Sequence, residues 1–187
     1  MNKGTFKVLL VSPRIPPSGG MSTFTESILN ESTKDQNIEI INVDTAVRWR
    51  KVWQTSLFYR FIGGAIQAKR NILLSFIKIL FNSPQVLHIC STAGPGLLRD
   101  IIIIILAKSM RIPTIIQFHT GRLPIDKQEN SWNWRLVCIA VKLVSSVAVF
   151  TKLEMAILKN LSPQKKILII PNLIDLNQID QIIGIDK

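Results

Sequence analysis

Short apolar runs alternate with longer segments of helical periodicity, and this alternation limits the folds open to the chain. The runs predict strands at Lys7–Val11, Ile38–Val43, Val86–Cys90, Thr114–His119, Val147–Phe150 and Ile167–Ile170. The periodic segments predict helices at Thr23–Ser32, Ala65–Phe81, Pro95–Ser109, Ser131–Val144 and Lys152–Asn160. Strands that are continuous in Val, Ile and Leu suit a parallel sheet covered on both faces. The sequence therefore predicts an α/β fold built on one doubly wound, mostly parallel sheet.

Length and composition restrict the chain further. A chain of 187 residues is enough for one good-sized α/β domain. No uninterrupted apolar stretch approaches the roughly 18 to 20 residues needed to span a bilayer, and the first residues do not resemble a secretory signal. We therefore expect a cytoplasmic protein. Cys90 and Cys138 lie in apolar runs without a C-x-x-C pairing, which predicts buried free thiols and no metal site.

The polar chemistry gathers in loops that follow predicted strands, where α/β proteins bind ligands. After the first strand, Gly19 and Gly20 precede a helix start, a layout that suits a phosphate group at a helix N-terminus. A tight turn without a ligand is the alternative. The segment Thr23–Glu26 fits a capping box. His88 lies in mid-strand and is expected to have a packing role.

Two later loops are expected to lie at the same edge of the sheet. Ser91 and Thr92 follow the third strand. His119, Gly121 and Arg122 follow the fourth. A histidine at the carboxyl end of a strand, in a loop containing glycine, is better placed for contact with a ligand than for filling the core.

Positive charge is unevenly distributed in this chain, whose net charge is +11. No Asp or Glu occurs between Thr45 and Arg99, and aromatic residues are interleaved with the cations there. Such a segment suits an anionic membrane surface. The predicted contacts are Arg48, Trp49, Arg50, Lys51, Trp53 and Arg60, in a loose interfacial loop and helix. A solvated basic face is one alternative and nucleic acid another, although nothing else in the chain resembles a nucleic-acid module.

Four segments in order resemble the N-terminal, acceptor-side domain of a family-4 glycosyltransferase with the GT-B fold. They are Lys7–Val11 with Gly19–Ser22, Val86–Ser91, Gln117–Arg122 and Ile169–Asp175. The likeness covers most of the chain and implies a Rossmann-like domain over residues 1–176, with a linker or tail over 177–187. It also implies a retaining transfer from a nucleotide-sugar donor to a lipid-linked or polysaccharide acceptor, without metal or cofactor.

The resemblance implies roles for individual residues. Gly19 and Gly20 would lie against the diphosphate and the acceptor, and His119 would face the donor sugar at the reacting centre. The C-terminal nucleotide-sugar domain of the family is missing from this sequence. We therefore expect the chain alone to be catalytically incomplete, either as a truncated product or as one half of an enzyme completed by a second chain.

Two other functions remain open at this stage. A noncatalytic adaptor at the inner face of the membrane would keep the fold and lose the chemistry. A nicotinamide-dependent enzyme would use Asp44, at the end of the second predicted strand, to bind a ribose. The proline-rich first loop lacks the G-x-G turn of such enzymes, which disfavours the second alternative.

Overall fold

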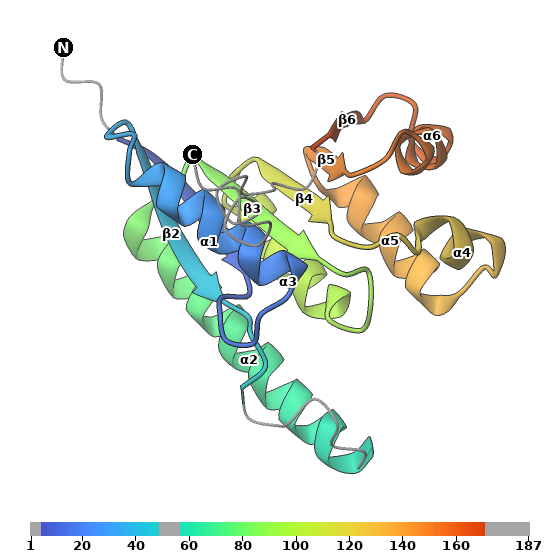
Figure 1. Ribbon diagram of the computed structural model, residues 1–187, viewed down its shortest axis with the longest axis horizontal. Coiled ribbons are helices and arrows are strands. Elements are labelled where there is room, and N and C mark those ends of the chain that lie inside the picture. Colours follow the sequence, from blue (N-terminus) through green and yellow to red (C-terminus); the bar gives the residue numbers. More distant parts are fainter. Residues whose placement is uncertain (1–4, 49–56, 171–187) are drawn as a thin grey trace, which may run out of the picture.

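A layer of parallel strands with helices packed against it makes up the computed structural model, which describes residues 5–48 and 57–170 (Figure 1). The strands are β1 (Phe6–Ser12), β2 (Ile38–Asp44), β3 (Val86–Ser91), β4 (Thr114–Phe118), β5 (Ser146–Val149) and β6 (Lys166–Ile169). The helices are α1 (Gly20–Ser32), α2 (Leu57–Asn82), α3 (Leu97–Ser109), α4 (Leu123–Gln128), α5 (Trp132–Leu143) and α6 (Lys152–Leu161). The predicted α/β class, with its Rossmann-like parallel sheet, is confirmed.

The six strands have the order β2-β1-β3-β4-β5-β6, and every neighbouring pair is parallel. The chain passes from β1 outward to β2, then crosses back to β3 and continues in the other direction. The loops that leave β1 and β3 therefore diverge, and this reversal is where doubly wound sheets bind ligands. Ser12 pairs in register with Asp44, and Ser91 with Phe118, so β1 to β4 end at one edge.

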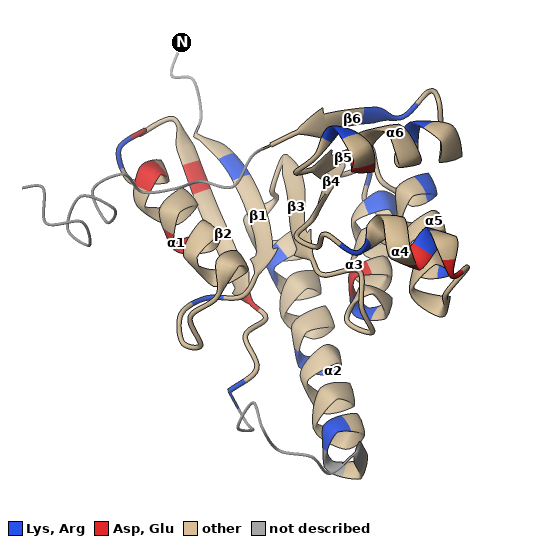
Figure 2. Cartoon of the chain, turned by 45° about the vertical axis from the view of Figure 1, so that its right-hand side comes forward, with Lys and Arg blue, Asp and Glu red and all other residues tan. Residues whose placement is uncertain are grey.

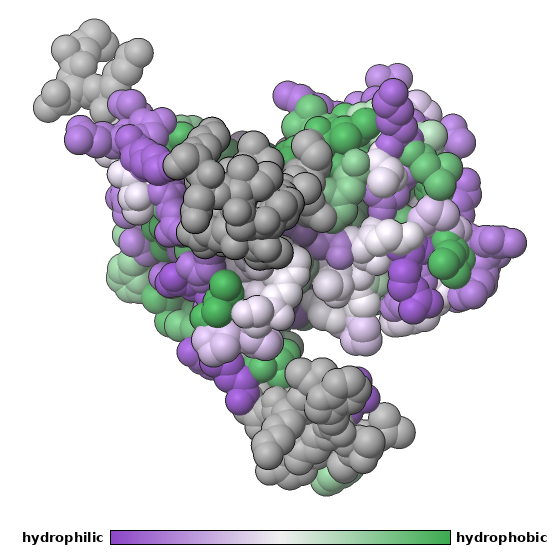
Figure 3. Space-filling model, in the orientation of Figure 1, coloured by the Kyte–Doolittle hydropathy of each residue, from purple (hydrophilic) through white to green (hydrophobic). Residues whose placement is uncertain are grey.

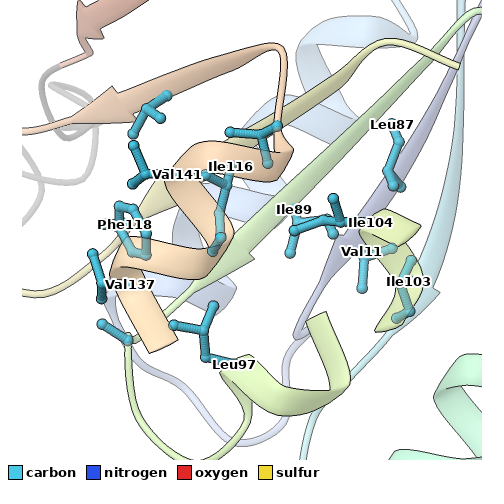
Figure 4. Close-up of a cluster of buried hydrophobic side chains, with 14 of the residues drawn as sticks. Val11, Leu87, Ile89, Leu97, Ile103, Ile104, Ile116, Phe118, Val137 and Val141 are labelled. Atoms are coloured by element: carbon cyan, nitrogen blue, oxygen red, sulfur yellow. The ribbon is translucent and has the colours of Figure 1, made fainter. Parts of the chain in front are cut away.

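Side-chain alternation along the strands divides the core into two unequal parts. The larger part lies between the sheet and the side that carries α2, α3 and α5, where α3 contacts both of its neighbours (Figure 4). In it, Ile89 and Phe118 from the strands pack with Ile104 and Val137 from the helices, all fully buried.

The other face is covered by α1 over β1 and β2, with a much smaller cluster of Leu10, Phe24 and Cys90. Farther along this face, the neighbouring strands β3 and β4 carry His88 and Gln117, whose side chains share a hydrogen bond of 3.1 Å. His88 therefore contacts a neighbouring strand within the sheet, in line with the packing role expected for it. Toward β5 and β6, apolar side chains reach the surface (Figure 3).

Three local predictions differ from the structure. The helix expected from Ala65 begins at Leu57, because α2 continues without a break through Gly63 and Gly64. The short helix α4 was missed within a loop expected over Thr120–Asn130, where Pro124 occupies the first turn. The capping box expected at Thr23–Glu26 is wrong, because α1 begins at Gly20 and Glu26 lies beyond its first turn.

Helix α2 has an unusual distribution of polarity. On its buried side, the side chains of Asn71 and Ser75 are fully enclosed and have no hydrogen-bond partner among the described residues. Its surface exposes large apolar side chains, namely Phe58, Phe61, Ile62, Ile66, Leu73, Phe76, Ile77, Leu80 and Phe81. Although Ile79 is also buried on this side, a helix that packs on a core in water normally keeps polar side chains out of its inward stripe and exposes few large apolar ones. An exposed apolar surface of this kind marks an interaction site.

We expect Ser75→Ala to raise the free energy of unfolding by about 1 kcal/mol. A buried hydroxyl without a partner costs roughly 1–3 kcal/mol, and Ala favours the helix over Ser. Urea denaturation followed by circular dichroism measures the change. Ile79→Ala, one turn later on the same face, is the control and should lose about 2–5 kcal/mol because it leaves a cavity. A loss of stability in Ser75→Ala would contradict the account of this hydroxyl.

Candidate ligand site at the carboxyl ends of the strands

The loops that follow β1, β3 and β4 meet at one edge of the sheet, as the sequence predicts. The backbone N–H of His119, just after β4, donates to the carbonyl oxygen of Ser91 at the end of β3, at 2.8 Å. The N–H of Thr45, after β2, donates to the carbonyl oxygen of Ser12 at 3.3 Å. These bonds extend the parallel ladder by one residue and tie the starts of the loops together.

The first turn of α1 is open to the surroundings. Gly19 caps the helix without a side-chain hydrogen bond, so no side chain of the described residues satisfies the first N–H groups. A Cβ atom added at Gly19 or Gly20 would meet nothing within 4 Å, and the backbone of Gly19 is extended, a conformation open to any residue. Neither packing nor strain therefore explains the two glycines. Close approach of an anion to the helix N-terminus would explain them.

An ion pair holds the β1–α1 loop against α1. Nε of Arg14 donates to one carboxylate oxygen of Glu26 at 2.8 Å, and Nη2 donates to the other at 2.9 Å. This bidentate hydrogen bond with Arg14 lowers the pKa of the Glu26 carboxyl. The residue that we predicted in a capping box therefore anchors the loop instead.

Beneath this loop lies a small buried polar chain. The Thr25 hydroxyl donates to the carbonyl oxygen of Met21 at 2.8 Å, so its 2.5 Å contact with the Ser12 hydroxyl uses the Ser12 proton. Burial raises the pKa of the neighbouring Cys90 thiol to about 12. Cys90 is therefore an unreactive buried thiol, and Cys138, half-buried, is also free.

His119 sits between two aromatic rings. The ring centroid of Phe24 lies 4.8 Å away and that of Phe150 4.9 Å away, both in edge arrangements. Burial, with a smaller contribution from His88, lowers the pKa of His119 to about 4, so the imidazole is neutral at pH 7. Its Nε2 atom is buried and has no hydrogen-bond partner among the described residues. A buried imidazole nitrogen without a partner is uncommon, and a ligand bound beside it would supply one.

The β3–α3 loop and the first turn of α3 add a strained backbone and a buried carboxyl group. Ser91 is buried and Thr92 exposed, while Ala93 takes a left-handed backbone with φ 57°, which costs a non-glycine residue about 1–2 kcal/mol. Burial raises the pKa of Asp100, although one carboxylate oxygen accepts two bonds from Arg99, at 2.6 and 2.9 Å. The other oxygen of Asp100 has no well-formed hydrogen bond among the described residues, although the Ser91 hydroxyl acts on this carboxyl and lowers its pKa. Strain and unpaired buried groups gather where proteins bind ligands.

Gly121 and Arg122 lie in the turn between β4 and α4. Both are exposed, and the backbone N–H of Arg122 donates to the Thr120 hydroxyl at 3.2 Å. The Arg122 side chain has no ion-pair partner among the described residues, so it is available to an anionic ligand.

Only two of the predicted membrane contacts fall within the described residues. Arg60 is exposed on α2, and Arg48 pairs with the carboxylate of Asp44. The predicted contacts Trp49, Arg50, Lys51 and Trp53 lie outside the described residues. Within the described residues, no helix is both long enough and apolar enough to cross a bilayer. The same residues contain no group of side chains that could hold a metal ion.

Sequence reasoning missed the partners of the site residues. Phe24 and Phe150 were not singled out because their proximity to His119 comes from packing between α1 and the ends of β4 and β5. Asp100 carried one usable signal, since an acidic residue one turn into a helix that follows a strand suits the positive end of the helix dipole. Nothing in the sequence indicated that its carboxyl would be buried.

Comparison with known proteins identifies no family. No model of a known protein family matches the sequence, and no curated protein matches it. Among solved structures, the chain resembles a conserved protein from Enterococcus faecalis at 12% identity, with a TM-score of 0.40. That alignment covers 86% of this chain and 99% of the other.

We expect acid to destabilise the fold through His119. Its pKa is lowered from 6.5 to about 4 in the folded state, so the unfolded chain binds a proton first as the pH falls. The free energy of unfolding should therefore decrease between pH 6.5 and pH 4, by up to about 1.4 kcal/mol per pH unit from this group. Urea denaturation of the unaltered protein and of His119→Gln at several pH values measures this effect. The difference between the two pH curves is the contribution of His119 to stability, because His88 is present in both proteins. Parallel pH curves for the two proteins would contradict the assignment.

Proposed function

We propose that this chain is the acceptor-binding half of a glycosyltransferase that moves a sugar from a nucleotide-sugar donor to a lipid-linked or polysaccharide acceptor. The observation that carries the proposal is the position of α2 relative to the candidate ligand site. The side-chain amide of Gln67 donates to the carbonyl oxygens of Thr45 and Ala46, so residues of α2 before Gln67 extend past the end of β2 (Figure 1). An exposed apolar helix thus begins beside the edge where the candidate site lies.

The candidate site supplies groups suited to a phosphorylated ligand. The uncapped start of α1 offers backbone N–H groups and a positive dipole end, which favour developing negative charge without a metal ion. His119 offers an unpaired neutral nitrogen for a hydrogen bond near the reacting centre. A second Rossmann-like domain, in the same polypeptide or in another, would supply the rest of the nucleotide-sugar pocket.

The described face of α2 suits an anionic membrane surface. It combines the exposed apolar side chains with Arg60, Lys69 and Arg70, and α2 contains no acidic residue (Figure 2). Each Lys or Arg near an anionic bilayer contributes about 1 kcal/mol, and the apolar side chains add to this by burial. The same absence of acids opposes pairing of α2 with a second copy of itself. We therefore propose a peripheral position on the inner face of the membrane, where a lipid-linked acceptor would be found.

Vesicle binding tests the membrane part of the proposal. We expect the protein to float with vesicles that contain anionic lipid at low salt, to float less with neutral vesicles, and to dissociate as salt is raised. The double variant Leu73→Ser/Leu80→Ser removes two exposed apolar side chains of α2 and should reduce the bound fraction severalfold.

Leu153→Ser is the matched control for vesicle binding. Leu153 is similarly exposed but lies on α6, at the other end of the sheet from α2 (Figure 1). Its loss should leave vesicle binding unchanged. Failure of the unaltered protein to bind anionic vesicles at low salt would overturn the membrane proposal.

Sugar transfer tests the activity. Labelled nucleotide sugars are incubated with a membrane lipid extract and the protein, alone and with the proteins encoded beside it. We expect labelled lipid only when a donor-binding domain is present, and about tenfold less label with Gly20→Ala, because its methyl group enters the open space where the phosphate would approach. Gly20→Ala should fold with unchanged or slightly higher stability.

The outcome of the transfer assay also separates the alternatives. Vesicle binding without transfer in any combination would favour the noncatalytic adaptor. The nicotinamide alternative is weakened by the structure, because the Asp44 carboxylate that would bind a ribose is already occupied. This carboxylate accepts hydrogen bonds from the backbone N–H groups of Arg14 and Ala46 and pairs with Arg48. Burial alone would raise the pKa of Asp44, but these bonds together lower it.

A further inference from the structure

A pocket of about 690 Å³ lies between the end of β2 and the N-terminal part of α2. Its apolar wall includes Phe58, Ile62 and Ile66 from α2, and polar groups enter it from Arg48 and Arg70. The volume falls within the range of roughly 300–1,000 Å³ typical of pockets for small ligands. None of its lining residues belongs to the loops that carry Gly19, Ser91 and His119.

The two arginines differ in what they can offer a ligand. Arg48 pairs with the carboxylate of Asp44, and its Nε donates to the carbonyl oxygen of Pro16 at 3.0 Å. Its charge is therefore neutralised within the chain. Arg70 is exposed and has no ion-pair partner among the described residues, so its guanidinium is the available cation of the pocket.

The hydrogen bond from Arg48 also connects the pocket with the candidate site. Pro16 belongs to the loop between β1 and α1, which leads to the open start of the helix at Gly19. A ligand that fills the pocket therefore lies beside that loop. The described lining has one apolar wall, one available cation at Arg70 and no acidic side chain. This chemistry matches an amphiphile with an anionic head.

We propose that this pocket binds the apolar chain of a phosphate-bearing amphiphile, with its phosphate against Arg70. The inference rests on the proposed function, since it names the chemical class of the acceptor. A guanidinium suits a phosphate because two of its N–H groups reach two oxygens of the anion. The apolar chain is buried against Ile62 and Ile66, and the phosphate remains at the rim of the pocket.

Isothermal titration calorimetry with dodecyl phosphate, below its micelle-forming concentration, tests the pocket without vesicles or transfer activity. We expect saturable binding at one molecule per chain. Dodecyl maltoside, with the same apolar chain and a neutral head, should bind at least about tenfold more weakly, and inorganic phosphate alone more weakly still. Non-saturable uptake, or equal binding of the two amphiphiles, would overturn the proposal.

Two matched pairs of variants locate the binding. Arg70→Gln and Lys69→Gln each remove one cation from α2, but only Arg70 lines the pocket. Arg70→Gln should weaken binding of dodecyl phosphate about tenfold, whereas Lys69→Gln should change it less than about twofold. Gly63→Leu places a side chain at a position that lines the pocket, and should abolish binding. Gly64→Leu, at the next residue, has open space for its Cβ and should retain binding.

Circular dichroism and thermal unfolding of each variant show whether the fold is kept. Equal affinities of Arg70→Gln and Lys69→Gln, with both folded, would overturn the proposal. Its failure is distinct from failure of the proposed function. If dodecyl phosphate binds in a way that depends on Arg70 and Gly63 but the protein does not float with anionic vesicles, the pocket is supported and the proposed membrane surface is contradicted. If the protein floats but dodecyl phosphate does not bind, only the pocket proposal is overturned.

Discussion

Packing of α3 and α5 against alternate side chains of the sheet is the interaction on which the rest of the structure depends. Leu9, Leu87 and Ile116 point from adjacent strands to this side and are fully buried with Ile103 and Val141. Because the period along a strand is two, the intervening residues must face the opposite side. That side is covered more thinly and carries polar side chains such as His88 and Gln117. One face of the sheet therefore supplies most of the stability, and the other is free to hold polar groups near the site.

Helix α2 differs from α3 and α5 in which side chains it buries and which it exposes. Enclosing the amide of Asn71 and the hydroxyl of Ser75 without partners costs free energy, and exposing Phe61 and Leu73 forgoes the gain from burial. A chain selected only for stability in water would reverse both choices. The distribution is understandable if the outer surface of α2 is covered by another phase or molecule, and the lack of acidic residues on α2 favours an anionic one.

The sequence predicted the strands well because most of them are short runs rich in Val, Ile and Leu that end at a change in composition. Helix starts were less well predicted. The helix predicted from Ala65 begins at Leu57, because α2 continues through Gly63 and Gly64, two residues of low helix propensity. The capping box expected at Glu26 occurs instead at Thr151 and Glu154, where the hydroxyl and carboxylate exchange bonds with backbone N–H groups. Loop order placed Gly20, Ser91 and His119 at one edge, whereas the rings around His119 depend on distant packing and could not be predicted.

The protonation state of His119 limits the part it can take in any reaction at this edge. A pKa of about 4 means that a charged imidazole is rare at pH 7, so His119 contributes little positive charge to this edge in the unliganded chain. In the proposed reaction, positive potential would come from the start of α1 and from arginine side chains such as Arg122. A neutral ring held between Phe24 and Phe150 can still orient a ligand through its unpaired nitrogen. Under the proposed function, the backbone dipoles at the start of α1 would therefore act on charge and His119 would act on the position of the ligand.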